Sequence, residues 1–170
     1  MPYTESGLAK CRDTIATQLV GSTDGNTTPL AIGSGRAILG YNARAVSDSD
    51  LYDDLVANGP LAIVGFPMGG LEVQSLTGTM RIPIILFVAK NKSADWTGTD
   101  IVDLVSSVLS RLATASAFTS GAFPPVNVSV DSWDWDYRNN PGVVAVTFSF
   151  TLFDPMVLDG RPGSGGMVPR

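Results

Sequence analysis

The sequence has no histidine and a single cysteine, Cys11, among 170 residues. Without histidine, no serine has the imidazole neighbour that activates it in a hydrolase triad. One cysteine forms neither an intrachain disulfide nor a thiolate zinc site, and Cys11 lies on the apolar side of a helical pattern, where it packs rather than reacts. The acidic residues are too dispersed to outline a metal site. We therefore expect a protein that is not an enzyme and that needs no cofactor or metal.

Charge is also scarce. Charged residues make up 16% of the chain, whereas about 25% is usual in soluble domains. The net charge is −5, and the eleven basic residues form no run, which disfavours a protein that wraps nucleic acid, because phosphates are bound by Lys and Arg. So little charge leaves two interpretations open: a surface covered by a partner subunit, or one rich in Gly, Ser and Thr.

Targeting and membrane-spanning segments are not evident either. The first residues, MPYT, lack the basic and apolar regions of a signal peptide. No apolar run reaches the roughly 18 residues that a membrane helix needs. We expect a protein that is made in a cytoplasm and has no membrane partner.

What is present is a long antiparallel hairpin near the end of the chain. Apolar residues on every second position predict a strand over 143–153, with a mate over 126–137 and a turn at 139–142. In the mate, the valines occupy even positions but the aromatic residues occupy odd ones. One inserted residue produces such a change of parity, so we predict a β-bulge near Asp131.

The aromatic end of that strand is the first candidate site. Trp133, Trp135 and Tyr137 alternate with Asp134 and Asp136. The run is typical either of a carbohydrate platform or of a surface that packs on a helix or a neighbouring subunit, since aromatic residues are enriched in both roles. Two carboxylates one residue apart are poorly placed for glycoside hydrolysis, which needs them on either side of the scissile bond. We favour the packing or subunit interface.

A second pair of strands is predicted over 61–66 and 79–90, with Met68-Gly69-Gly70 bending the chain between them. Pro83 falls inside the longer strand. Because proline cannot donate to a ladder, we expect Pro83 on a sheet edge or at a bulge, and we count it as the second candidate interface position.

Three helices are predicted. Apolar residues at helical spacing mark 5–20, a short helix over 49–57, and a long one over 100–115 whose polar face includes Arg111. The segment 21–47 is irregular, and its glycine-rich part at 33–40 lacks the closing Gly-Lys-Ser/Thr of a phosphate loop, so we interpret it as a flexible connection.

Together these elements predict one α+β domain over 1–155. A small, mostly antiparallel sheet of two hairpins is covered by helices in the order αββαββ, with an extra short helix before the first hairpin. Residues 156–170 are rich in Gly and Pro. We interpret them as a flexible C-terminal tail, or as an arm that orders on a neighbouring subunit.

This order of elements, the size, the acidic balance and the irregular insertion after the first helix resemble the tail terminator (tail completion) proteins of long-tailed bacteriophages over residues 4–155. The resemblance implies a structural virion protein, assembled in the host cytoplasm, that forms a homohexameric ring on the finished tail tube. Its partners would be other copies of itself, the tail tube, the sheath of a contractile tail, and neck proteins, with DNA passing through an acidic lumen.

Because no motif fixes an alignment with that family, no interface residue is carried over from it. Two alternatives remain: another neck or head–tail connector component, and, from a different class, a carbohydrate-binding module that uses the run from Trp133 to Tyr137.

Overall fold

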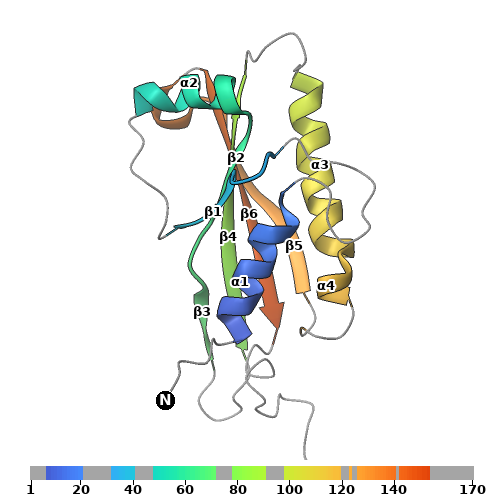
Figure 1. Ribbon diagram of the computed structural model, residues 1–170. Coiled ribbons are helices and arrows are strands. Elements are labelled where there is room, and N and C mark those ends of the chain that lie inside the picture. Colours follow the sequence, from blue (N-terminus) through green and yellow to red (C-terminus); the bar gives the residue numbers. More distant parts are fainter. Residues whose placement is uncertain are drawn as a thin grey trace, which may run out of the picture.

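The computed structural model describes residues 7–20, 32–40, 48–71, 78–90, 98–119, 123, 126–140 and 142–153. They form one mixed sheet of six strands with helices packed on both of its faces (Figure 1). The expected α+β class is confirmed. The C-terminal tail and most of the 21–47 insertion lie outside the described residues, so the expectations for them stay predictions.

The sheet runs in the order β1-β2-β4-β6-β5, and β3 pairs with β4 beyond the end of β2. Both predicted hairpin pairings, β2 with β4 and β5 with β6, are antiparallel as expected, and only β1 and β2 pair in parallel. The strands are β1 (Ala37–Leu39), β2 (Leu61–Val64), β3 (Met68–Leu71), β4 (Gly78–Ala89), β5 (Val126–Asp134) and β6 (Val143–Phe153).

Two of these strands correct the sequence-based interpretation. The stretch 37–39, expected within a flexible connection, is strand β1, and the expected bend at Met68-Gly69-Gly70 is strand β3. Both are short, and β3 contains two glycines, so neither shows the alternation that predicts a strand. Each forms a strand because it pairs with a longer neighbour, β1 with β2 and β3 with β4.

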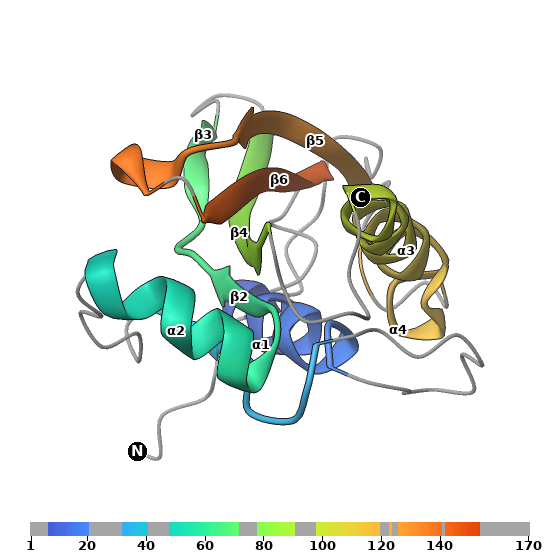
Figure 2. The same cartoon turned by 90° about the horizontal axis from the view of Figure 1, so that it is seen from above.

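Helices cover the two faces unequally. The helices α1 (Gly7–Gln18), α3 (Gly98–Thr114) and α4 (Ser116–Thr119) pack on one face. The opposite face carries α2 (Asp48–Asn58) and the 3-10 turn η2 (Tyr137–Asn139), gathered at one end of the sheet. Seen from above, α2 and α3 are separated by the strands (Figure 2).

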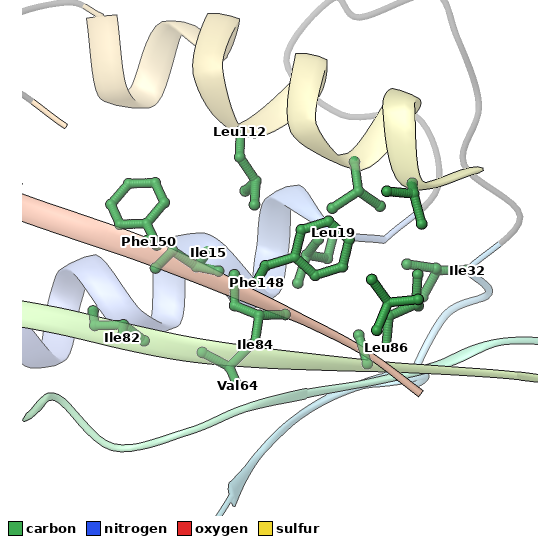
Figure 3. Packing of buried hydrophobic residues seen from close by; sticks show 14 of the residues in the cluster. Ile15, Leu19, Ile32, Val64, Ile82, Ile84, Leu86, Leu112, Phe148 and Phe150 are labelled. Carbon is green, nitrogen blue, oxygen red and sulfur yellow. The ribbon is translucent and has the colours of Figure 1, made fainter. Parts of the chain in front are cut away.

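The main core lies under α1 and α3. The even-numbered side chains of β4 and β6 point into it, including Phe148 and Phe150, which are fully buried. Ile15 comes from α1, and Leu112 projects from α3 toward the two phenylalanines (Figure 3). Each such side chain contributes about 1.5–3 kcal/mol on burial before conformational entropy is subtracted, so this layer is the principal source of stability.

A smaller core lies under α2. Leu51 and Leu55 pack against the odd-numbered residues of β4 and β6, among them Phe87 and Ala145. The second half of β4 is therefore buried on both sides, as its continuous apolar sequence predicts.

Helix α3 differs from its prediction in one respect. Its apolar stripe is buried as expected, but Arg111, expected on the polar face, is only 1% exposed. Burial lowers the pKa of the Arg111 guanidinium. The predicted stripe continues through Leu112 to Ala115, just after the helix, and the burial of Arg111 extends it by one neighbouring residue. The stretch Ile101–Thr119 is long and apolar enough to cross a membrane by length and composition alone; here its apolar stripe packs on the sheet.

Candidate interaction surface

The predicted β-bulge is confirmed and orients the first tryptophan. The β5–β6 register shifts between Val130 and Ser132, which leaves Asp131 as the extra residue. The shift turns Trp133 to the face that the β5 valines already share, and its ring packs against the main core. Without the bulge, Trp133 would face the opposite side of the sheet.

Trp135 lies just beyond the end of β5 and stacks on Trp133. The ring centroids are 5.6 Å apart and the planes are inclined by 14°. Trp135 remains 50% exposed, so one part of this large apolar side chain contacts Trp133 and the rest faces outward. An aromatic ring in this state is suited to a protein–protein contact.

Tyr137 does not belong with the two tryptophans. The strand ends at Asp134, before the expected end at 137, and Tyr137 begins the turn η2. Its ring packs edge-on against Phe87 in the smaller core, with 4.9 Å between centroids. Lys90 forms an ion pair with Asp136 beside it. The aromatic run is thus divided between the two faces of the sheet, and the three rings do not form one platform.

Pro83 is not on a sheet edge, which was one of the two positions expected for it. It lies in β4, with β6 on one side and the β2–β3 segment on the other. The carbonyl of Pro83 accepts a hydrogen bond from the Gly65 N–H at 2.8 Å. β4 pairs with β2 and with β3 in registers that differ by one residue. The missing N–H of Pro83 therefore faces an irregular junction, which is the bulge-like setting that was the other expected position.

A polar network on the same face was not found by sequence reasoning. The Ser149 hydroxyl, on a residue only 2% exposed, donates to the carboxylate of Asp131. Asp131 also lies 3.8 Å from a guanidinium nitrogen of Arg81, and the Ser129 hydroxyl donates to it at 3.4 Å. Three strands thus meet at the bulge residue. The parity change in the sequence predicted the bulge, but it did not predict which residues contact Asp131.

This network marks an open part of the second face. The side chains on this part of the face are mostly small and polar, and no helix in the described ranges packs over them. Ser149 is buried beside Asp131, and the others are Thr79, Arg81, Pro83, Thr147, Thr151, Asn127 and Ser129. The interpretation of a surface rich in hydroxyl groups fits this patch. The covered half, by contrast, carries Phe87 and Ala145.

Chemistry elsewhere in the described chain is limited. Burial raises the pKa of the Cys11 thiol to about 12, which keeps it protonated. No group of three or more His, Cys, Asp or Glu residues that could hold a metal occurs in the ranges that the structure describes. Comparison with known proteins adds no identification, because neither a protein-family model nor a curated protein matches the chain.

Proposed function

We propose that this chain is a structural subunit of a long-tailed bacteriophage, which assembles into a homo-oligomeric ring that caps the tail tube and joins it to the neck. The observation that carries the proposal is the sheet's two different edges. β5 forms one edge, and β1 and β3 form the other. A closed ring requires two distinct, complementary surfaces on each subunit, and the two edges are distinct surfaces available for this role.

The distribution of exposed apolar side chains supports assembly. Phe66 and Met68 are 57% and 48% exposed at the β3 edge, and Trp135 is 50% exposed beyond the end of β5. Large apolar residues at both edges are costly on a free monomer and typical of surfaces that meet a partner. The low share of charged residues is consistent with the same role.

The acidic balance supports the position in the particle. A net charge of −5 per chain gives a ring that repels phosphates as a whole, which is compatible with DNA passing through it without binding. The α+β architecture is the one that the resemblance to tail terminators implies. The carbohydrate-binding alternative is less well supported, because Trp133 packs on the core and Tyr137 lies on the other face.

The first test is the oligomeric state of the purified full chain. Light scattering is expected to give a closed oligomer, and negative-stain electron micrographs are expected to show six-fold rings. A monomer at high concentration would overturn the proposal. Retention of that monomer on immobilised glycans would favour the carbohydrate-binding alternative.

The second test concerns the partner. Mixed with preassembled tail tubes, the rings are expected to bind one end of each tube and to be rare along its length. Rings that ignore tube ends would exclude the capping role while leaving ring formation intact.

A further inference from the structure

The end of α2 carries a chemically labile pair of residues that the proposed function does not use. Asn58 is followed by Gly59, and this is the one Asn-Gly dipeptide in the sequence. Asparagine is a thermolabile residue, and a following glycine has no side chain to hinder the approach of its nitrogen to the asparagine carboxamide. Asn58 is exposed, so water reaches this side chain.

The fold requires the glycine of this pair. Gly59 has a φ of +82°, and its N–H donates to the Leu55 carbonyl at 2.9 Å, as in the left-handed residue that commonly ends a helix. Pro60 follows and cannot continue the helix. A residue with a side chain would slow the reaction but would be strained at this φ. The labile pair is therefore a consequence of the way α2 ends.

The folded chain restrains both reacting groups. The Gly59 nitrogen can attack only after it loses the proton that it donates to Leu55. The Asn58 carboxamide is turned back along the helix, where Nδ2 donates to Oδ1 of Asp54 at 2.8 Å. Arg36 holds the Asp54 carboxylate through contacts of 3.2 and 2.7 Å and also donates to the Gly59 carbonyl at 2.8 Å. One arginine thus fixes the acceptor of the Asn58 amide and the backbone beside it.

We propose that Asn58 is a site of spontaneous deamidation and that the Arg36–Asp54 contact sets its rate. The Gly59 nitrogen loses its proton to a base in the solvent and bonds to Cγ of Asn58, while the Cγ–Nδ2 bond breaks and Nδ2 leaves as ammonia. Water then opens the cyclic imide at either carbonyl, which gives aspartate or isoaspartate. The sum consumes one water and releases one ammonia. This inference does not depend on the proposed ring.

The product weakens the contact that restrains the reaction. An aspartate in place of Asn58 no longer donates to Asp54 and sets a like charge four residues away on the helix, which is destabilising. The pKa of Asp54 is lowered mainly by the Arg36 hydrogen bond and further by that of Asn58, so this second contribution is lost. The Arg36 carbonyl accepts from the Ala62 N–H at 2.8 Å, and we expect the modification to loosen the attachment of β1 to α2.

Incubation of the full chain at mildly alkaline pH tests the site. Peptide mapping by mass spectrometry measures the conversion of Asn58 in native buffer and in urea, at one pH and temperature. We expect conversion to be at least about tenfold faster in urea, because the end of the helix must first open in the folded chain. Asn127, which precedes a valine, is the internal comparison and is expected to stay unconverted. Equal rates at Asn58 in both solvents, or no conversion in urea, would overturn the proposal.

Two alanine variants isolate the contact. Asp54→Ala removes the group that holds both Arg36 and the Asn58 amide, whereas Asp53→Ala removes an exposed carboxylate of the same helix. The folded Asp54→Ala chain is expected to convert Asn58 about tenfold faster than the wild type, as the loss of a hydrogen bond to a charged group predicts. Asp53→Ala is expected to convert it at the wild-type rate. The same rate in all three chains would show that the Arg36–Asp54 contact has no control over the reaction.

A mimic of the product gives a measurement that does not need the Asp54 variant to fold. Asn58→Asp carries the charge of the product, while Asn58→Gln keeps the amide and places it one carbon farther from the Gly59 nitrogen. We expect the glutamine variant to resist conversion in urea and the aspartate variant to unfold about 2–4 °C below it. Equal unfolding temperatures would contradict the proposed loosening, and rapid conversion of the glutamine variant would contradict the cyclic intermediate.

Discussion

At the scale of single residues, one ion pair ties β1 to the end of α2. The two guanidinium nitrogens of Arg36 lie 3.2 and 2.7 Å from the Asp54 carboxylate oxygens, and Arg36 also donates to the Gly59 carbonyl at 2.8 Å. This pairing lowers the pKa of Asp54, with the Arg36 hydrogen bond as the largest cause. A bidentate arginine of this kind fixes geometry as well as charge.

The expected consequence is a stability that depends on pH. Because the Asp54 pKa is lower in the folded chain than in the unfolded chain, its contribution is complete above the ordinary value of 3.8 and is lost as the pH falls through the lowered value. Asp54→Asn is expected to reduce the free energy of unfolding by about 1–2 kcal/mol near neutral pH, and the deficit should narrow in acid. Urea titrations of the wild type and of Asp54→Asn, from neutral to acidic pH, measure this difference in the free energy of unfolding.

The neighbouring Asp53 provides the control. It is exposed on the same helix, so Asp53→Asn is expected to leave the unfolding free energy within about 0.5 kcal/mol of the wild type. An equal loss in both variants would mean that the helix charge matters and the Arg36 contact does not.

At the scale of elements, the junction of β2, β3 and β4 depends on one glycine. A Cβ added to Gly65 would lie 2.8 Å from Cγ of Pro83, which sits in a rigid ring. Gly65→Ala is therefore expected to destabilise the fold by about 1–3 kcal/mol through overpacking. Gly70→Ala is the matched control, because a Cβ there meets nothing within 4 Å. Thermal unfolding of both variants measures this effect. Equal stability of the two variants would contradict this account of the junction.

Elements with a strong internal pattern could be predicted from the sequence. β4, β6 and α3 each carry a long apolar period, and the parity change in β5 located the bulge at Asp131. Elements held by their neighbours could not be predicted: β1 has three residues and β3 is half glycine. Pro83 was expected on an edge or at a bulge, and the sequence could not decide between them because it does not show that the partner strand is interrupted opposite Pro83.

The candidate site was predictable only in part. The aromatic run was found, but its division between two faces depends on where β5 ends, and the turn η2 carries Tyr137 across to Phe87. Ser149 and Arg81 reach Asp131 from strands far away in sequence. Arg111 is next to the apolar stripe of α3. It is buried because the rest of the fold covers more of the helix than the stripe alone, and the sequence does not show this.

At the scale of the whole molecule, Trp135 connects monomer stability with assembly. It follows the edge strand β5, stacks on Trp133 and is 50% exposed. Removing the stack is expected to cost the monomer about 0.5–1.5 kcal/mol. If the assembled oligomer also buries the exposed part of the Trp135 indole, Trp135→Ala should raise the half-assembly concentration by more than about tenfold. Substitution of a central aromatic residue in an interface typically has an effect of this size. Light scattering over a dilution series measures that concentration.

Val102 supplies the comparison that separates the two effects. It is 53% exposed on α3, so Val102→Ala is expected to change neither monomer stability nor assembly. If Trp135→Ala unfolds more easily but assembles at the wild-type concentration, this tryptophan contributes only to packing within the subunit. An unchanged oligomer that loses retention on immobilised glycans would assign it to carbohydrate binding instead, because the aromatic face would then act on a ligand and not on a neighbouring copy.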